Sequence, residues 1–510
     1  MQDQTSKSKR IAKNTLLLYF RMLFLMFINL YASRVILEAL GVEDYGVYNV
    51  VGGFVAMFSI ISSPLTSACS RFLNYEMGKG IQDRIRIVFS TSLSVHILLA
   101  LFIAILCEVI GLWYLNNHMV LPAERLVAAT FCFHFSVFNF CTNLITIPYN
   151  AAIIAHERMK VFAYVSLFEG IAKLLVCFLI MVTPFDRLIF YGFLLLVIQL
   201  CVRASYQLYC KRNFEECRYV FVVDRVLIGQ MFAYTSWQLI GHVSRVLRTQ
   251  GVDLLLNSFF GPVLNAAKGI ANQVQGTVEG FANNFMVAMN PQITQSYAEG
   301  DYKYMFKLIY NGSRYAFYML LLLSLPIIIN ADFVLNIWLK QVPVFTVVFV
   351  QLILICTLIT SLSHTLITAV NATGRIRNYQ IVVGGIQLLN LPLCYLFLRI
   401  GFDATSVMVI AVFSELFALI VRLFMVSWNI PLFNISDYFI NVIFPCVSVS
   451  VLAAVLPIIM KIILNYSVFS SLANIILSFL ICSITIFFWG CSRNERLLVI
   501  SKGIKIIRRL

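Results

Sequence analysis

Residues 238–300 read QLIGHVSRVLRTQGVDLLLNSFFGPVLNAAKGIANQVQGTVEGFANNFMVAMNPQITQSYAEG. The stretch is apolar enough for two membrane helices joined at Gly261-Pro262, yet it also carries many charges and amides. An ionised side chain at the centre of a bilayer costs roughly 2.5–3.5 kcal/mol on the insertion scale, so these groups cannot all face lipid. We therefore expect a hairpin of two membrane helices that lines a polar cavity, and we place the functional site there.

The composition of the whole chain is that of a polytopic membrane protein. Its 510 residues are 60% hydrophobic and only 12% charged, whereas soluble domains contain about 25% charged residues. The net charge of +15 fits Lys and Arg in cytoplasmic loops, where they set topology, and we expect no nucleic-acid partner. The thirteen cysteines form no CxxC motif and lie mostly in apolar runs, so we expect neither disulfides nor a bound metal.

Apolar runs of the length that a bilayer requires, about 20 residues, occur fourteen times. We expect membrane helices at 12–39, 45–75, 85–111, 123–150, 160–182, 187–211, 226–257, 262–296, 304–331, 343–371, 379–399, 405–429, 438–464 and 469–491. Loops rich in Lys and Arg alternate with loops that hold few, so both termini are expected in the cytoplasm. The loops are too short for a soluble catalytic domain, and we expect no enzyme, no catalytic residues and no cofactor.

Three short patterns recur at an offset of about 220 residues. The pattern Ala-x-x-Arg-x-basic occurs at 155–160 and 372–377, a glycine opens the second and eighth spans, and both spans close with a Tyr-x-x-Gly pattern at 75–78 and 297–300. An even number of spans separates the copies, so the two halves share one orientation, as in transporters built from parallel repeats. We expect six-helix bundles at 1–218 and 219–433, followed by two extra helices and a basic tail at 434–510.

Cations outnumber acids in the first, second, seventh and eighth spans, which the repeat brings together. We therefore expect an anionic substrate, bound by Arg21, Arg34, Arg71, Arg245, Arg248 and Lys268. Arginine suits phosphate in particular, because its planar fork donates two parallel hydrogen bonds. Alternatives stay open for two of these residues. Arg34 can pair with Glu38 at i, i+4, and Arg71 can be an anchor whose head reaches the cytoplasmic interface.

Acids within the spans are the candidates for a coupling ion, because burial favours their protonated form and permits proton exchange. Glu279 comes first, since it lies midway along the eighth span; Asp253 and Glu415 follow. The alternative for Glu279 is a structural pair with an arginine of the seventh span. Asp253 can pair with only one of those arginines. In the fifth span we expect Glu169 and Lys173 to neutralise each other at i, i+4.

Five stretches carry a resemblance to a known family: LGVEDYGVY at 40–48, the close of the second span at 71–80, the stretch 261–300, and the loops around Arg158 and Arg375. They resemble Wzx-type O-antigen and capsular polysaccharide flippases of the multidrug/oligosaccharidyl-lipid/polysaccharide (MOP) exporter superfamily. The resemblance covers essentially the whole chain, and its motifs are diffuse. It implies two six-helix bundles that form a V around a central cavity.

The resemblance also implies a function. Such a protein would flip a polyprenyl-diphosphate-linked oligosaccharide, a unit of lipopolysaccharide O-antigen, capsule or exopolysaccharide, between the leaflets of a bacterial inner membrane. Transport would run from the cytoplasmic to the periplasmic leaflet by alternating access, coupled to an ion gradient, with cationic cavity residues on the diphosphate or on acidic sugars. Membrane lipids, a polysaccharide polymerase and a chain-length regulator are further candidate partners.

Three other functions are alternatives. A drug or cation antiporter of the same superfamily would want a cavity dominated by acids, whereas bases outnumber acids here. A peptidoglycan-precursor flippase would need a cationic cavity too, so charge does not exclude it. A membrane enzyme that acts on lipid-linked sugars would need a sizeable outer loop, or acids and a histidine clustered at one membrane face, and the sequence offers neither.

Overall fold

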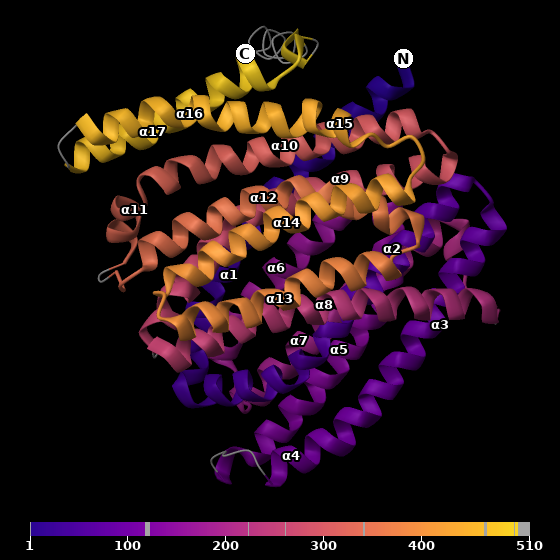
Figure 1. The fold of residues 1–510 in the computed structure, drawn as a ribbon. Coiled ribbons are helices and arrows are strands. Elements are labelled where there is room, and N and C mark those ends of the chain that lie inside the picture. The colour runs from indigo at the N-terminus through magenta and orange to yellow at the C-terminus, as the bar shows by residue number, and fades with distance from the viewer. Residues whose placement is uncertain are drawn as a thin grey trace, which may run out of the picture. The chain divides into compact units, whose positions relative to one another are not determined.

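The computed structural model describes residues 2–117, 123–222, 224–260, 262–339, 342–463, 467–493 and 495–497. All regular elements within these residues are helices (Figure 1), which confirms the all-α expectation. The longer helices are α1 (Gln2–Ala56), α2 (Ser62–Lys79), α3 (Gln82–Leu106), α5 (Leu126–Ala155), α6 (Met159–Val182), α7 (Arg187–Asn213), α8 (Arg225–Phe260), α9 (Pro262–Glu299), α10 (Tyr302–Ile329), α12 (Thr346–Thr373), α13 (Arg377–Ile400), α14 (Thr405–Asn429), α16 (Phe444–Ile463) and α17 (Val468–Thr485). The short elements are η1 (Met57–Ile61), η2 (Cys107–Gly111), α4 (Leu112–Asn117), η3 (Ala123–Arg125), η4 (Glu215–Cys217), α11 (Ala331–Trp338), α15 (Ile435–Tyr438), η5 (Phe439–Ile443) and η6 (Ile486–Gly490).

Ten helical segments of the described residues are long and apolar enough to cross a membrane, which confirms a multi-pass membrane protein. Helices α8 and α9, with 36 and 38 residues, are long enough but are not among the ten. Their polar and charged side chains lower their hydropathy. These two helices hold the stretch 238–300, so the elements that the sequence marks as too polar for lipid are indeed long helices.

Helix α1 contains a sharp bend at Gly41. The backbone there has φ 78° and ψ 168°, and it separates two helical segments. A positive φ costs glycine little because it has no Cβ, whereas other residues are strained in that region. The predicted break between the spans at 12–39 and 45–75 is therefore confirmed, and the second of these spans continues through η1 into α2.

Contacts divide the chain into two units. Unit 1 comprises residues 1–242 and 294–300, and unit 2 comprises residues 243–293 and 301–510. The division falls inside α8 and inside α9, so each of these helices contributes to both units. These boundaries are set by packing in this structure. The bundle boundaries at 218 and 433, which follow from the sequence repeat, stay predictions.

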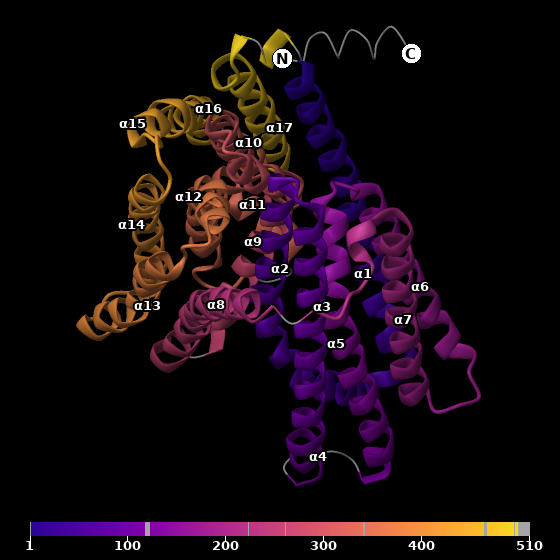
Figure 2. The ribbon, with the colours of Figure 1, turned by 90° about the vertical axis from the view of Figure 1, so that its right-hand side faces the viewer.

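In unit 1, α5 is the helix with the most neighbours: it packs against α7, α3, α2 and α1. Figure 2 shows these helices running side by side, and α6 closes the group by packing on α1 and α7. A helix surrounded in this way can direct one face toward protein or an internal cavity rather than toward lipid. The polar residues of α5 therefore need not face the membrane.

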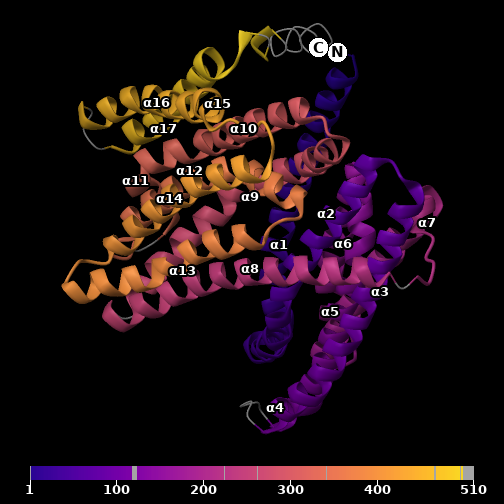
Figure 3. The same cartoon turned by 45° about the vertical axis from the view of Figure 1, so that its right-hand side comes forward.

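In unit 2, the helices pack in a series. Helix α13 packs on α14, α14 on α12, α12 on α10, and α10 on the pair α16 and α17 (Figures 1 and 3). The hydroxyl of the fully buried Tyr438 donates to the Leu362 carbonyl at 2.6 Å and lies 2.9 Å from the hydroxyl of Ser313, which can donate to it. Buried hydroxyls require such partners, and these bonds fix α15 against α10 and α12.

Gly78 lies at a close contact between two helices of unit 1. A Cβ at this position would lie 2.5 Å from the Gln295 carbonyl oxygen and 2.7 Å from the Ala298 Cβ. Only glycine therefore allows α2 to approach the last turns of α9 this closely. Nearby, the rings of Tyr75 and Tyr297 lie 6.4 Å apart. These two tyrosines begin the Tyr-x-x-Gly patterns that the sequence repeats.

Candidate functional site

The carboxylate of Glu415 on α14 is the hub of the buried polar contacts in unit 2. Its Oε1 accepts hydrogen bonds from Arg248 Nη1 on α8 at 2.8 Å and from Gln387 Nε2 on α13 at 2.9 Å. Its Oε2 accepts from Arg422 Nη1 at 3.3 Å. A carboxylate this deeply buried requires such partners, because an unpaired buried charge is very costly. Arg422 lies two turns further along the same helix.

Among the described residues, Arg422 donates hydrogen bonds to three side chains, whereas Arg248 donates to one. Besides Glu415, Arg422 donates to Ser363 Oγ on α12 at 3.0 Å and to the Tyr379 hydroxyl on α13 at 3.4 Å. Its side chain is 7% exposed, compared with 22% for Arg248. Arg422 thus fixes the carboxylate in place. Arg248 is the more exposed of the two partners.

Arg245 adds a third guanidinium to this network. It lies on α8 within electrostatic range of Arg248, Arg422 and Glu415. Glu279 on α9 is within electrostatic range of Arg248 and Glu415. Among the described residues, three guanidiniums therefore share this region with two carboxylates. The cationic binding site that the sequence predicts stays a prediction, and Arg422, which the sequence did not single out, belongs to this network.

Lys268 and Asp253 form a separate pair. Lys268 Nζ lies 2.8 Å from Asp253 Oδ1 and donates to the Thr249 carbonyl at 3.0 Å. Asp253 therefore neutralises the lysine of α9 and not an arginine of its own helix. The ion-coupling role expected for Asp253 and the substrate-binding role expected for Lys268 stay predictions, and the pairing must open before either group acts alone.

A small cavity of about 140 Å³ lies beside these groups in unit 2. Arg248 and Lys268 line it together with the amide side chains of Asn272, Gln275 and Asn390, and no carboxylate is among the lining residues that the structure describes. Cations and neutral donors without an acid suit an anion rather than a cation. The cavity thus unites two of the residues that the sequence proposes for substrate binding.

Glu279 has one hydrogen bond among the described residues, from Gln275 Nε2 to its Oε1 at 3.0 Å. Both residues lie on α9, one turn apart. The alternative role expected for Glu279 was an ion pair with an arginine of the seventh span. No such pair is present in the part of the chain that the structure describes. Its role as a coupling site stays a prediction.

The candidate cations of the first two spans lie in unit 1. Arg21 donates to Ser166 Oγ at 3.1 Å, and its guanidinium carbon lies 4.4 Å from the centroid of the Phe162 ring. Arg71 lies over the rings of Phe72 and Tyr75, at 4.6 Å and 4.7 Å. The side chains of Arg34 and Glu38 lie outside the described residues. The binding roles of these arginines stay predictions.

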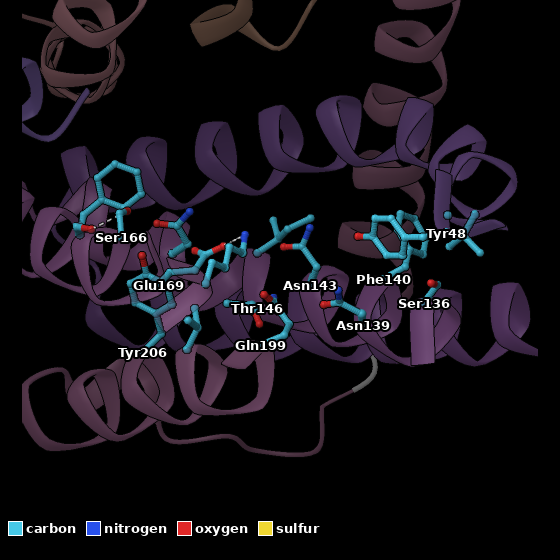
Figure 4. A pocket seen from close by; sticks show the side chains of 17 residues that line it. Tyr48, Ser136, Asn139, Phe140, Asn143, Thr146, Ser166, Glu169, Gln199 and Tyr206 are labelled. Carbon is cyan, nitrogen blue, oxygen red and sulfur yellow. Dashed lines mark hydrogen bonds and ion pairs between the residues drawn. The ribbon is translucent and has the colours of Figure 1, made fainter. Parts of the chain in front are cut away.

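Unit 1 also contains a polar cavity of about 460 Å³ (Figure 4). One end is formed by Tyr48, Ser136 and Phe140, and the other by Ser166 and Tyr206, with Asn139, Asn143 and Gln199 between them. Arg21 does not line this cavity, but it holds Ser166 and Phe162, which do. Glu169 and Lys173 also line it, and they form the expected pair at 2.6 Å.

Four helices contribute one face each to this cavity. The residues lie at alternating spacings of three and four, which is the spacing of a single helical face: Tyr48, Gly52 and Val55 on α1; Ser136, Asn139, Asn143, Thr146 and Asn150 on α5; Phe162, Ser166, Glu169 and Lys173 on α6; Gln199, Val202 and Tyr206 on α7. The sequence reasoning missed this site because it followed ionised residues. The amide stripe of α5 was the signal that could have revealed it.

Comparison with known proteins identifies the fold. No protein-family model matches the chain, and no curated protein matches it in sequence. Among solved structures, a MATE transporter in complex with MaD3S aligns with a TM-score of 0.72 at 13% identity, over 85% of this chain and 97% of the other. A multidrug resistance MATE family transporter of the MOP superfamily, in an outward-facing conformation, aligns with a TM-score of 0.71 at 12% identity, over 85% and 96%.

A third structure is a MOP superfamily transporter from Pyrococcus furiosus, for which reverse polarity of the binding pocket suggests a different function. It aligns with a TM-score of 0.69 at 12% identity, over 85% of this chain and 96% of the other. At these identities the likeness establishes the fold. The chain is a multi-pass membrane protein with the fold of MATE transporters, which belong to the MOP superfamily. The narrower resemblance to Wzx-type flippases rests on the sequence alone.

Proposed function

We propose that the chain is a transporter that flips a polyprenyl-diphosphate-linked oligosaccharide from the cytoplasmic to the periplasmic leaflet of a bacterial inner membrane. The fold supports transport as the general activity, since its structural neighbours are transporters. The observation that supports an anionic lipid head group is the concentration of guanidiniums around Glu415. Arg245, Arg248 and Arg422 all lie in helices of unit 2.

The contacts of Glu415 provide a route for binding the diphosphate. If Arg248 turns from Glu415 to a phosphate oxygen, the carboxylate keeps its bonds from Arg422 and Gln387. No buried charge is then left without a partner, which would otherwise be the main cost of breaking such a pair. The cavity beside Arg248 supplies Lys268 and several amides as further donors. Together they resemble the donor sets that bind phosphate elsewhere.

Two other exporters share part of this support. A multidrug exporter is equally consistent with the fold, since one structural neighbour is a multidrug resistance transporter. An organic cation, however, would meet more positive than negative charge in unit 2. A peptidoglycan-precursor flippase would use the same diphosphate chemistry, so only its sugars distinguish it. A polysaccharide polymerase and a chain-length regulator are the protein partners that the proposed substrate implies.

Reconstitution into liposomes separates these functions. Flipping is measured with three probes: a polyprenyl-diphosphate-linked oligosaccharide, a lipid-linked peptidoglycan precursor and the organic cation ethidium. We expect the first probe to be flipped several-fold faster than in protein-free liposomes, with little movement of ethidium. Transport of ethidium alone would show that the protein is a multidrug exporter. Faster flipping of the peptidoglycan precursor than of the oligosaccharide lipid would identify that precursor as the substrate. Transport of none of the probes would refute the proposal.

A further inference from the structure

We propose that the polar cavity of unit 1 is a carbohydrate subsite, which binds uncharged sugar rings of the transported molecule. This inference rests on the proposed function and adds a second site to it. The cavity measures about 460 Å³, which lies within the range of small-molecule sites, about 300–1,000 Å³. It lies within unit 1, whereas the arginine network belongs to unit 2.

The first argument is that the charges of the cavity are already balanced. Among the lining residues that the structure describes, Glu169 supplies the one carboxylate and Lys173 the one amine, and they pair with each other at 2.6 Å. An organic cation would have to displace Lys173 from Glu169, and an anion would have to displace Glu169 from Lys173. A neutral ligand requires neither, so the balance of charge favours an uncharged ligand.

The second argument is the supply of amides. Asn139 and Asn143 on α5 and Gln199 on α7 line the cavity, and Figure 4 draws no hydrogen bond between them and the other lining residues. The amide oxygen of Asn150 is buried without a hydrogen-bond partner among the described residues. An amide side chain both donates and accepts, and so does a sugar hydroxyl. A ligand rich in hydroxyls therefore satisfies these groups better than an apolar one.

The third argument is the placement of aromatic rings. Tyr48 and Phe140 lie at one end of the cavity and Tyr206 near the other, with the amides between them (Figure 4). A sugar ring has polar edges and two faces that carry C–H groups. Aromatic rings provide apolar surface for such faces, and tyrosine adds a polar tip. This mixture differs from typical drug sites, which are lined predominantly by hydrophobic side chains with few polar groups.

The arrangement also has a structural basis that a chance cavity would lack. All four contributing helices present residues at the spacing of one helical face, and α5 is packed among α1, α2, α3 and α7. Exposure of three asparagines to lipid would be unfavourable, because no water is available to satisfy them. Their stripe on α5 instead faces the cavity, where a hydrated ligand or water can bind.

The test compares two lipids on the full-length protein in nanodiscs, since glycoside detergents could occupy the site. One is the lipid-linked oligosaccharide extracted from a strain that lacks the gene for this chain, and the other is undecaprenyl diphosphate without sugar. Binding is measured by native mass spectrometry. We expect Asn143→Leu and Gln199→Leu each to weaken binding of the sugar-bearing lipid at least tenfold, while binding of the bare lipid stays within twofold of wild type.

Asn213→Leu is the matched control. Asn213 lies on α7, as Gln199 does, but it is exposed outside the cavity and donates to the Tyr209 carbonyl. It should bind both lipids as wild type does, and thermal unfolding of each variant checks folding. Equal binding of the sugar-bearing lipid by the wild type and both cavity variants would overturn the subsite. So would an equal loss for both lipids in a folded variant.

An organic cation, tetraphenylphosphonium, tests the competing ligand class. Suppose that tetraphenylphosphonium binds the wild type, that Glu169→Gln abolishes this binding, and that Asn143→Leu leaves it unchanged. The cavity is then a cation site and the inference is wrong. A failure of the proposed function has a different signature. In that case the wild-type protein binds neither lipid, irrespective of the cavity variants.

Discussion

Arg248 on α8 donates to Glu415 on α14 across 2.8 Å, so the cation proposed for substrate binding is already paired with the acid proposed for ion coupling. The two predicted roles are therefore linked in one contact. A ligand that draws Arg248 away leaves Glu415 with Arg422 and Gln387. Substrate binding and the charge state of the carboxylate then influence each other, and by linkage the influence is reciprocal.

Replacement of Glu415 should destabilise the protein. Glu415→Gln leaves Arg248 and Arg422 close together in a buried site without a counter-charge, and breaking a buried pair in this way costs about 3–5 kcal/mol. Thermal unfolding in detergent should show a clear fall in Tm. Asp437→Asn, which changes an exposed carboxylate of the same unit, should leave Tm nearly unchanged. An unaltered Tm for Glu415→Gln would show that the pairing carries no stability.

Arg245 provides a test of the predicted substrate-binding role. Arg245→Ala should abolish flipping of the diphosphate-linked lipid in liposomes while the protein remains folded. Arg245→Lys should restore only part of the activity, because an ammonium retains the charge but loses the bidentate fork. Full activity of the alanine variant would remove Arg245 from the binding site, and full rescue by lysine would show that charge alone is needed.

Outside the membrane helices, Arg125 joins two segments of unit 1. Its Nη1 donates to Asp186 Oδ2 at 2.6 Å, and Asp186 stands at the start of α7. Its Nε donates to Asp44 Oδ1 at 2.6 Å, and Asp44 lies just beyond the bend at Gly41. Burial alone would raise the pKa of Asp186, but the hydrogen bonds and charge of Arg125, with the backbone amides, outweigh it. The pKa is therefore lower than the ordinary 3.8.

The pH dependence of this contact follows from the sign of the shift. Because the folded-state pKa lies below the unfolded value, the stabilisation is complete above 3.8 and is lost as pH falls through the lowered pKa. The Tm difference between wild type and Arg125→Ala should be constant from about pH 7 to pH 5 and shrink at lower pH. Arg187→Ala is the control, since Arg187 donates to the Ala39 carbonyl at 2.9 Å, which does not titrate. A Tm difference for Arg125→Ala that grows as pH falls below 3.8 would contradict this account.

Gly78 should tolerate no side chain. In Gly78→Ala the new Cβ would meet the Gln295 backbone oxygen at 2.5 Å, and overpacking of this kind costs about 1–3 kcal/mol. Gly276→Ala provides the comparison, since a Cβ there meets nothing within 4 Å and alanine is the better helix former by about 1 kcal/mol. Thermal unfolding should therefore show opposite shifts. Equal Tm values would mean that α2 and α9 separate at little cost.

How much the sequence could predict depends on the kind of signal. Apolar runs and the polar stretch 238–300 located the long helices, because both follow from the chemistry of a bilayer. The bend at Gly41 was also predictable, since a glycine stood between two runs. Contacts between distant helices were not. The pairing of Glu415 with Arg248 joins residues 167 positions apart, and no local spacing encodes it.

The cavity of unit 1 was missed for a different reason. Ionised residues are conspicuous in a membrane sequence because each is costly in lipid, and attention to them drew the prediction to the first, second, seventh and eighth spans. Asn139 and Asn143 carry no charge, yet their spacing of four on α5 is as regular as that of any charged pair. Neutral amides at helical spacing within an apolar run are therefore a useful signal for a cavity.

The last prediction concerns the coupling ion and Glu279. An ion can shift the balance between inward-facing and outward-facing states only if it binds them differently. Glu279 suits this role because its one hydrogen bond among the described residues comes from Gln275 on the same helix, so it can exchange a proton or bind sodium without breaking an ion pair with another helix.

Glu279→Gln should keep binding of the lipid-linked oligosaccharide but lose any acceleration of flipping by a pH or sodium gradient in liposomes. Glu299→Gln, at the exposed end of the same helix, should respond to the gradient as wild type does. If wild-type flipping ignores both gradients, or if Glu279→Gln responds as wild type, Glu279 is not the coupling site.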